Sequence, residues 1–383
     1  MAAINGCGFF SLSLMQMVSF ASPLWGHQLQ LSAVMLGLVL SARTITPLVY
    51  SIHFGALMDS IGVRRLMLVF TLVCIVLPVL HPLFPGLGAL FALQIGLGLG
   101  AATVWLAAQT AVARHAAGER TRIARFFFFT AAGNIVGPPL VGVAWTAAGH
   151  WGGFGLISLW AAVLFGFVLA LPGDAVAGRR RFDWWVLLPD IRAYGRAWRV
   201  FLRPVTTFAV LCALLRFCSI SIQDSFYPFY MKEMGFSPAT IGMLLAIGSA
   251  VGAPASLAAG WWTRLAGNER RAAVLAVALS ITAIGLTPVY GHFWMFAVAI
   301  AVHGFGMAVS MPLIVVLLSS GIPRHEQGVT AALRATANRV AAFVVPPVMG
   351  VVVQVAGLES AFLALAAVLV LMTFALEMAF RRL

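Results

Sequence analysis

The feature that most constrains the fold of this chain is a motif that occurs twice, 205 residues apart. The first copy runs from Gly55 to Arg65, and the second runs from Gly260 to Arg271. Identical residues recur at the same separation in and around the two copies: Pro23 and Pro228, Ser32 and Ser237, Gly37 and Gly242, Gly55 and Gly260, and Gly62 and Gly267. An internal repeat of this size predicts two structurally related halves.

Composition indicates what the halves are made of. Hydrophobic residues make up 62% of the chain and charged residues 9%, and the mean hydropathy is +0.99. A transmembrane helix needs ~20 mainly apolar residues. We expect twelve such helices, at residues 4–25, 32–54, 66–84, 88–112, 126–148, 154–172, 204–230, 238–262, 272–290, 293–319, 333–355 and 358–379. The predicted fold is an all-α integral membrane protein, with twelve transmembrane helices in two pseudo-symmetric six-helix bundles.

The bundles are expected at residues 1–172 and 204–383, joined by a cytoplasmic linker at residues 173–203. In the second part of this linker, apolar residues alternate with arginines at helical spacing: Ile191, Tyr194, Trp198, Phe201 and Leu202 with Arg192, Arg196, Arg199 and Arg203. This pattern predicts an amphipathic helix that lies in the cytoplasmic membrane interface. We favour a role as a tether between the bundles over a role as a regulatory site.

The net charge of +13 is distributed by connection. Arginines gather in the even-numbered connections between spans, whereas Lys232 is the only Lys or Arg in the odd-numbered connections. Cytoplasmic loops retain basic residues, so we expect a multi-pass protein of the cytoplasmic (inner) membrane with both termini in the cytoplasm. Because the charge follows topology, it does not indicate a nucleic-acid partner.

Cysteines and the other reactive residues give little sign of catalysis. Cys7, Cys74, Cys212 and Cys218 all lie in predicted spans, where buried thiols usually act as small apolar fillers. Their spacing indicates neither a metal site nor a disulfide. The sequence also lacks a nucleophile–base pair and a Gly-rich phosphate loop. We therefore expect no enzyme activity, no cofactor and no metal.

The repeated motif resembles a signature of the major facilitator superfamily, which lies between the second and third spans of its members. Gly55, Asp59, Gly62, Arg64 and Arg65 match that signature, whereas Ser60 replaces a usual basic residue. A carboxylate is stabilised at the positive N-terminus of a helix. The resemblance implies that Asp59 faces span 11 and that these five matching residues form a gate. The alternative role of Arg64 and Arg65 is to fix topology alone.

A second segment, from Gly133 to Gly142, is similar to the span 5 signature of antiporters in the same superfamily. It includes Gly137 and Pro138, and it departs from the signature only at Val141. Glycines four residues apart allow close helix approach, and proline bends a helix. We interpret Gly133, Gly137, Pro138 and Gly142 as part of the gate, although generic membrane packing explains the same residues. The resemblance covers the whole chain and implies a monomeric transporter that works by alternating access.

Two arginines are predicted to bind substrate. Arg43 lies near the middle of span 2 and Arg216 near the middle of span 7. Ionisable groups inside a membrane are costly and are commonly functional. From Arg216, the residues Ser219, Gln223 and Tyr227 follow on one helix face and are expected to face water. Two buried cations predict a site for a carboxylate or phosphate, unless backbone carbonyls satisfy them and their role is structural. Further predicted contacts are Gln16 in span 1 and Trp105 in span 4.

Proton coupling requires a group that titrates. The first six spans contain no Asp or Glu near their middle, unlike many proton-driven exporters of the superfamily. Asp224 and His303 are the predicted proton-coupling residues, because a partly desolvated carboxylate can titrate near neutrality and histidine does so inherently. Each also has a simpler interpretation, as a solvated carboxylate at the extracytoplasmic mouth and as a packing histidine.

The leading hypothesis is a secondary active transporter that exports a small amphipathic or anionic organic solute in exchange for protons. Its nearest alternative is proton-coupled uptake of an organic anion, which the two arginines and the missing span 1 acid favour. A remote alternative is a non-transporting membrane receptor or assembly factor. The expected partners are a small-molecule substrate, protons and the lipid bilayer.

Overall fold

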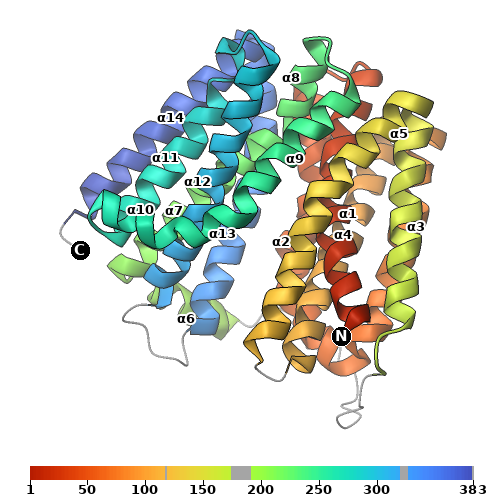
Figure 1. The fold of residues 1–383 in the computed structure, drawn as a ribbon, viewed down its shortest axis with the longest axis horizontal. Coiled ribbons are helices and arrows are strands. Elements are labelled where there is room, and N and C mark those ends of the chain that lie inside the picture. The colour runs from red at the N-terminus through yellow and green to blue at the C-terminus, as the bar shows by residue number, and fades with distance from the viewer. Residues whose placement is uncertain (117–118, 174–190, 320–326, 382–383) are drawn as a thin grey trace. The chain divides into compact units, whose positions relative to one another are not determined.

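A computed structural model describes residues 1–116, 119–173, 191–319 and 327–381 of the chain. Within these ranges the side chains at 51–56, 59, 191–194 and 196 lie outside the description, so the predicted roles of Gly55 and Asp59 do too. All regular secondary structure of the described ranges is helical (Figure 1).

The helices follow one another with short connections. The first five are α1 (Ala2–Gln28), α2 (Ala33–Ile61), α3 (Val63–Leu83), α4 (Leu87–His115) and α5 (Arg120–Leu169). They are followed by α6 (Ile191–Phe201), α7 (Pro204–Ser225), α8 (Tyr227–Glu233), α9 (Pro238–Ala255), α10 (Ala259–Ala266), α11 (Glu269–Gly285), α12 (Phe293–Ser319), α13 (Gln327–Ala356) and α14 (Leu358–Ala379), with 3-10 turns η2 (Ser256–Ala258) and η3 (Thr287–Val289).

The prediction of twelve transmembrane helices is confirmed. In the described residues, ten helical segments are long and apolar enough to cross a membrane. One of them, α5, contains two spans, because Ala148 and Gly149 leave the helical conformation within it. Helix α11, with 17 residues, adds the remaining span. Helices α7 and α8 together form one span, as do α9 and α10.

Helix α6 begins at Ile191 and ends at Phe201, in the second part of the predicted linker. Within it, Trp198 is 61% exposed, whereas Val200 is buried. The position of this helix in the cytoplasmic membrane interface stays a prediction.

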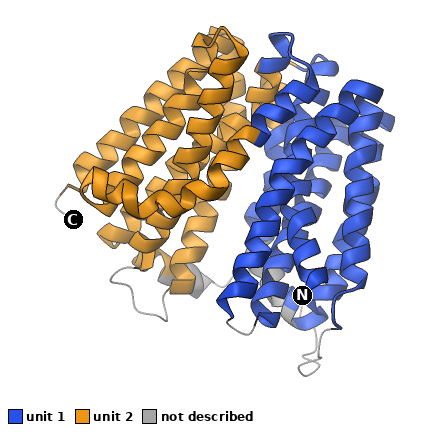
Figure 2. Cartoon of the chain, viewed as in Figure 1, with its two compact units in different colours: residues 1–31, 39–189, 231–246 blue, residues 32–38, 190–230, 247–383 orange. Residues whose placement is uncertain are grey.

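The chain divides into two compact units, shown in different colours in Figure 2. Unit 1 consists of residues 1–31, 39–189 and 231–246, and unit 2 consists of residues 32–38, 190–230 and 247–383. In unit 1, α1 packs on α4 and α5, and α3 packs on α4 and α5. In unit 2, α7 packs on α11, α12 and α13, and α11 packs on α14.

Backbone geometry confirms that the two halves are related. Six described residues have a positive φ, and they form three pairs: Gln30 with Gly235, Gly62 with Gly267, and Gly149 with Gly357. The first two pairs are separated by 205 residues and the third by 208. A positive φ is accessible to glycine without steric cost, and each of these residues lies at the end of a helix or, for Gly149, at the break within α5. The repeat in the sequence is thus a repeat of turns as well.

Candidate functional site

Arg216 is positioned in unit 2 by the contact between α7 and α12. Its Nη2 donates a hydrogen bond to the Met307 carbonyl at 2.9 Å, and its Nε lies 3.1 Å from Ser310 Oγ. Among the described residues, no carboxylate lies within ion-pair distance of this guanidinium. Arg216 is partly buried. The Met307 carbonyl and the Ser310 hydroxyl, which are both neutral, hold its guanidinium, so these contacts do not compensate its positive charge.

A second arginine approaches the same part of α12. Arg334 lies in the second turn of α13, and its Nη1 is 3.7 Å from Met311 Sδ. The positive charges of Arg216 and Arg334 act on each other. We call Arg216, Met307, Ser310 and Arg334 the arginine cluster. Arg334 is not among the site residues predicted from the sequence; its position at the start of the span expected at 333–355 was the signal that could have identified it.

Ser219 lies one turn beyond Arg216 and faces the interior of unit 2. Its Oγ is 3.2 Å from Ser280 Oγ and 3.4 Å from His303 Nδ1. His303 Nδ1 also lies 3.1 Å from the Ser280 carbonyl, which can only accept, so Nδ1 carries the proton. His303 Nε2 is therefore an acceptor, and this atom is buried without a hydrogen-bond partner in the described part of the chain.

The expectation that the polar face of α7 faces water is wrong for two of its residues. Ser219 and Tyr227 are 0% and 2% exposed. Serine and histidine on α11 and α12 turn Ser219 inward, and Tyr227 lies beyond the end of α7, where Phe226 separates it from that helix. Gln223 and Asp224, at the last turn of α7, are partly buried.

The predicted residues of unit 1 lie on three different helices. Arg43 is partly buried where α2 crosses α4 so closely that a Cβ at Gly98 would overlap the Arg43 carbonyl. Trp105 of α4 stacks on Phe126 of α5, with ring centroids 6.1 Å apart. Gln16 of α1 is partly buried. The role of these three residues in substrate binding stays a prediction.

The gate predicted between α2 and α3 is described in part. Gly62 caps α3 with φ of 100° and ψ of 145°, which explains the need for glycine. Arg64 Nη2 donates to the Leu169 carbonyl at the end of α5, at 2.6 Å. Arg65 is exposed. Arg64 thus binds the exposed carbonyls of a helix C-terminus, a stabilising position for a cation.

The segment from Gly133 to Gly142 makes close contacts along its length. A Cβ at Gly133 would overlap the Phe9 carbonyl of α1, and Gly137 lies against Met17 and Ser13 of the same helix. Pro138 and Gly142 contact the start of α9, where a Cβ at Gly142 would overlap the Pro238 carbonyl. The glycines are therefore required for α5 to approach two neighbours within unit 1.

The same contact exists in unit 2. A Cβ at Gly37 of α2 would overlap the Pro346 carbonyl of α13, and one at Gly350 of α13 would overlap the Ala33 carbonyl of α2. These contacts are the repeat-related counterparts of those between α5 and α9. Each unit thus contains one proline–glycine contact of the same design.

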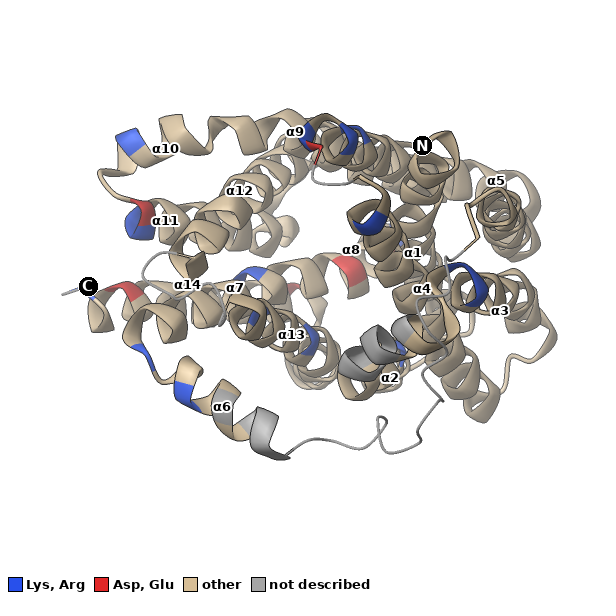
Figure 3. Cartoon of the chain, turned by 90° about the horizontal axis from the view of Figure 1, so that it is seen from below, with Lys and Arg blue, Asp and Glu red and all other residues tan. Residues whose placement is uncertain are grey.

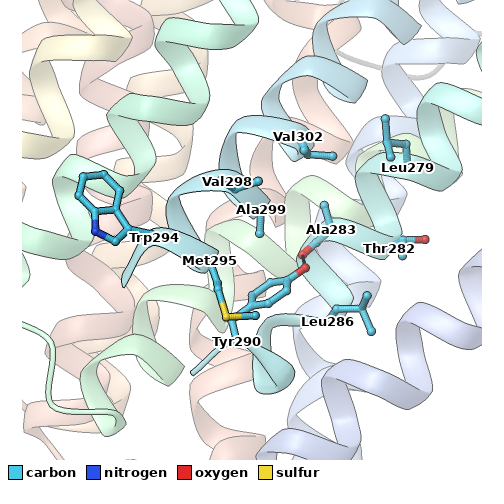
Figure 4. A pocket seen from close by; sticks show the side chains of 10 residues that line it. All are labelled: Leu279, Thr282, Ala283, Leu286, Tyr290, Trp294, Met295, Val298, Ala299 and Val302. Atoms are coloured by element: carbon cyan, nitrogen blue, oxygen red, sulfur yellow. Dashed lines mark hydrogen bonds between the residues drawn. The ribbon is translucent and has the colours of Figure 1, made fainter. Parts of the chain in front are cut away.

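Two cavities differ sharply in character. An apolar one of about 490 Å³ lies in unit 2 between α11 and α12, where Trp294 is largely exposed and the Tyr290 hydroxyl donates to the Ala283 carbonyl (Figure 4). It contains no charged group and so offers nothing to orient a polar solute. A polar one of about 650 Å³, which we call the outer cavity, lies in unit 1. His27 and Lys232 line it, and His27 Nε2 pairs with Glu233 at 3.1 Å.

Comparison with known proteins places this geometry in a wider context. Residues 4–289 and 209–383 match the model of the Major Facilitator Superfamily. No curated protein matches the chain by sequence. The solved structure of the nucleoside transporter NupG has a TM-score of 0.80 and 14% identity, covering 100% of this chain and 99% of that one. A POT family transporter in complex with 5-aminolevulinic acid has a TM-score of 0.74 and 13% identity, covering 99% and 95%. At these identities the two structures establish a shared fold.

Proposed function

Because the chain belongs to the major facilitator superfamily, we propose that this membrane transporter carries a small amphipathic organic anion by alternating access and exchanges it for protons. The arginine cluster of unit 2 is the observation that carries the choice of an anion. Arg216 and Arg334 contribute two positive charges to one stretch of α12, where Met307 and Ser310 hold Arg216 and Met311 contacts Arg334.

Two cations that share a half-buried site favour binding of an anion, since no carboxylate of the described residues pairs with either of them. Each guanidinium retains N–H donors beyond those used on α12, and these can form charge-assisted hydrogen bonds with a carboxylate or phosphate. An anion between Arg216 and Arg334 would also remove their mutual repulsion. The Met307 and Met311 side chains on the same helix supply adaptable apolar contacts, which suits a solute with an apolar body.

Proton coupling is assigned to His303 and Asp224. His303 is hydrogen bonded to Ser219, one turn from Arg216, so its protonation adds a positive charge close to the arginine cluster. Asp224 lies about two turns beyond Arg216 on α7. Export rests on the similarity of the Gly133–Gly142 segment to the antiporter signature, and on the close packing that this segment makes.

Two proteins with the same fold support a small organic solute as cargo. One is a nucleoside transporter, and the other is a POT family transporter in complex with 5-aminolevulinic acid. The second ligand is itself a small organic acid, as the arginine cluster requires. The inner membrane, the monomeric state and the predicted contacts of Arg43, Gln16 and Trp105 belong to the same proposal.

Proton-coupled uptake is the second candidate. The observation that favours it is the absence of Asp and Glu from the middle of the first six predicted spans, because many proton-driven exporters of the superfamily keep an acid there. In a symporter, anion and proton cross in the same direction, and the proton then offsets the charge of the anion.

Transport in everted membrane vesicles tests the direction. With an acidic interior, an antiporter accumulates the organic anion inside the vesicle, whereas a symporter does not. We expect accumulation of organic acids and none of cationic drugs. A protein that moves cationic compounds alone would contradict the role of the arginine cluster, and accumulation only under the opposite gradient would establish uptake.

Substitution of Arg216 tests the anion site. We expect Arg216→Ala to raise the KM for an organic acid about 10- to 100-fold, since a hydrogen bond to a charged group contributes roughly 1.5–3 kcal/mol. Arg216→Lys keeps the charge and loses the planar fork, so its loss is smaller. The matched control is Arg264→Ala on α10, which removes an exposed arginine. Equal KM values for the Arg216→Ala and Arg264→Ala variants would disprove the site.

A further inference from the structure

Unit 1 contains a buried polar cluster that the proposed function does not use. His81 of α3, Gln94 of α4 and Ser22 of α1 are 0%, 2% and 4% exposed. Gln94 Nε2 lies 2.9 Å from Ser22 Oγ and 3.4 Å from His81 Nε2. The imidazole stacks on Phe154 of α5, with ring centroids 4.9 Å apart. The cluster around His81 therefore includes residues of four helices, α1, α3, α4 and α5.

The hydrogen bonds determine which nitrogen of His81 carries the proton. Nδ1 lies 2.9 Å from the Leu77 carbonyl, which can only accept, so Nδ1 is the donor. The amide nitrogen of Gln94 can only donate, so Nε2 of His81 must accept from it. His81 is thus a neutral imidazole whose unprotonated nitrogen, Nε2, faces Gln94.

The amide oxygen of Gln94 makes no hydrogen bond within the described part of the chain. This atom, Oε1, is buried. Buried acceptors are nearly always satisfied, because leaving one unpaired is costly. Rotation of the amide by half a turn would exchange its two ends, so that Oε1 faces both His81 and Ser22. In that state Oε1 can accept from His81 only if Nε2 carries a proton.

We propose that His81 is a proton-binding site of unit 1 and that Gln94 transmits its protonation to α1. A proton from water binds Nε2, which changes from acceptor to donor. The Gln94 amide turns, and its Oε1 accepts from His81 Nε2 and from Ser22 Oγ. The Ser22 hydroxyl then leaves the Val18 carbonyl, to which it donates at 2.7 Å in the neutral state. The neutral form leaves Gln94 Oε1 without a partner among the described residues, whereas the protonated form satisfies Oε1 and turns the amide nitrogen to the position that Oε1 leaves. Protonation thus selects between two arrangements.

The surroundings provide access and few competing charges. Gln94 of α4 and Phe154 of α5 contact His81, Ser22 of α1 contacts Gln94, and all three are uncharged. The other titratable groups that α1 and α5 place on this side are His27, which lines the outer cavity and pairs with Glu233 of α8, and His150, whose Nδ1 is 2.9 Å from Gln28 Nε2. Lys232 of α8 also lines that cavity.

The outer cavity is the source of water for this site. Trp145 forms part of its lining, and the Trp145 ring lies 5.5 Å from that of Phe154, which covers His81. The rings of Trp145 and Phe154 therefore lie between the cavity and the imidazole. His81 also lies in the last turn of α3, which ends at Leu83. This inference rests on the proposed function in one respect, because it adds to proton-coupled transport a proton-binding group within unit 1.

The test is ¹⁵N NMR of the full chain with labelled histidines in lipid nanodiscs between pH 8 and pH 5. The chain contains 8 histidines, and His81→Asn identifies the signals of His81. If that variant does not fold, Phe154→Leu identifies them instead, because it removes the stacked ring and shifts them. We expect protonation at Nδ1 alone at pH 8 and at both nitrogens toward pH 5. A neutral ring throughout the range would overturn the proposal.

The role of Gln94 is tested in the same measurement. Gln94→Leu removes the acceptor for the protonated ring, so proton binding should weaken about tenfold and the midpoint should move about one pH unit lower. The control, Thr103→Val, removes a buried hydroxyl of α4 that bonds only its own helix, and it should leave the midpoint unchanged. An unchanged midpoint in the Gln94→Leu variant would disprove the coupling. No solute is transported in this experiment, so its failure is distinct from a failure of the proposed function.

Discussion

Gly142 shows how one missing methyl group determines a contact between helices. Its Cα lies against the Pro238 carbonyl, so that α5 and the start of α9 touch through backbone atoms. Gly142 is visible in the sequence as a glycine that follows Gly137 and a pair of prolines. The sequence does not show which helix such a glycine approaches, because a small residue indicates only that a neighbouring segment lies close to it.

Substitution of Gly142 should therefore destabilise the protein. We expect Gly142→Ala to cost roughly 1–3 kcal/mol, the usual range for overpacking, and to reduce transport by changing the contact with α9. The matched control is Gly155→Ala on the same helix, where a Cβ meets no atom within 4 Å. Because alanine favours helix more than glycine does, that variant should be as stable as the parent or slightly more so. Thermal unfolding in detergent compares them; equal changes in Tm would show that the contact is unimportant.

At the scale of elements, apolar length predicted the helices well and their breaks poorly. The span expected at 204–230 is divided at Phe226, two residues before Pro228, and the span expected at 238–262 is broken after Pro254. Conversely, the spans expected at 126–148 and 154–172 run on as one helix, α5, with a break only at Ala148 and Gly149. Length and hydropathy do not detect such breaks, because the residues at them are as apolar as the rest.

The faces of the helices were harder to predict than their ends. Periodicity placed Ser219 on the same face as Arg216, yet Ser219 turns to Ser280 and His303 because those two residues supply polar partners inside unit 2. His81 lies in the span expected at 66–84, but its hydropathy pattern does not show that the side chain is fully buried against Gln94 and Phe154. In both cases the deciding atoms lie on helices distant in sequence, and no local pattern contains them.

For the whole molecule, the repeat was the most reliable guide. The same turns recur at Gly62 and Gly267, and the same proline–glycine contacts recur in the two units. The polar residues do not repeat: the arginine cluster belongs to unit 2, and the His81 cluster belongs to unit 1. A duplicated scaffold thus carries different polar chemistry in its two halves.

The charge distribution makes a prediction about how the whole chain lies in the membrane. Basic residues occur on α6, on α10 and at the start of α11 (Figure 3). Basic loops remain in the cytoplasm, so Arg65, between α2 and α3, should be cytoplasmic, and the connection that holds His292, between η3 and α12, should be outside. Both side chains are exposed, which makes them suitable for labelling.

A membrane-impermeant maleimide tests this orientation. The native cysteines are all buried, so they contribute little background. In intact cells, His292→Cys should react, whereas Arg65→Cys should react only after the membrane is permeabilised. The reverse pattern would place both termini outside, because an even number of spans returns the chain to the side on which it began. It would also contradict the proton route, since the outer cavity and His81 would then open to the cytoplasm.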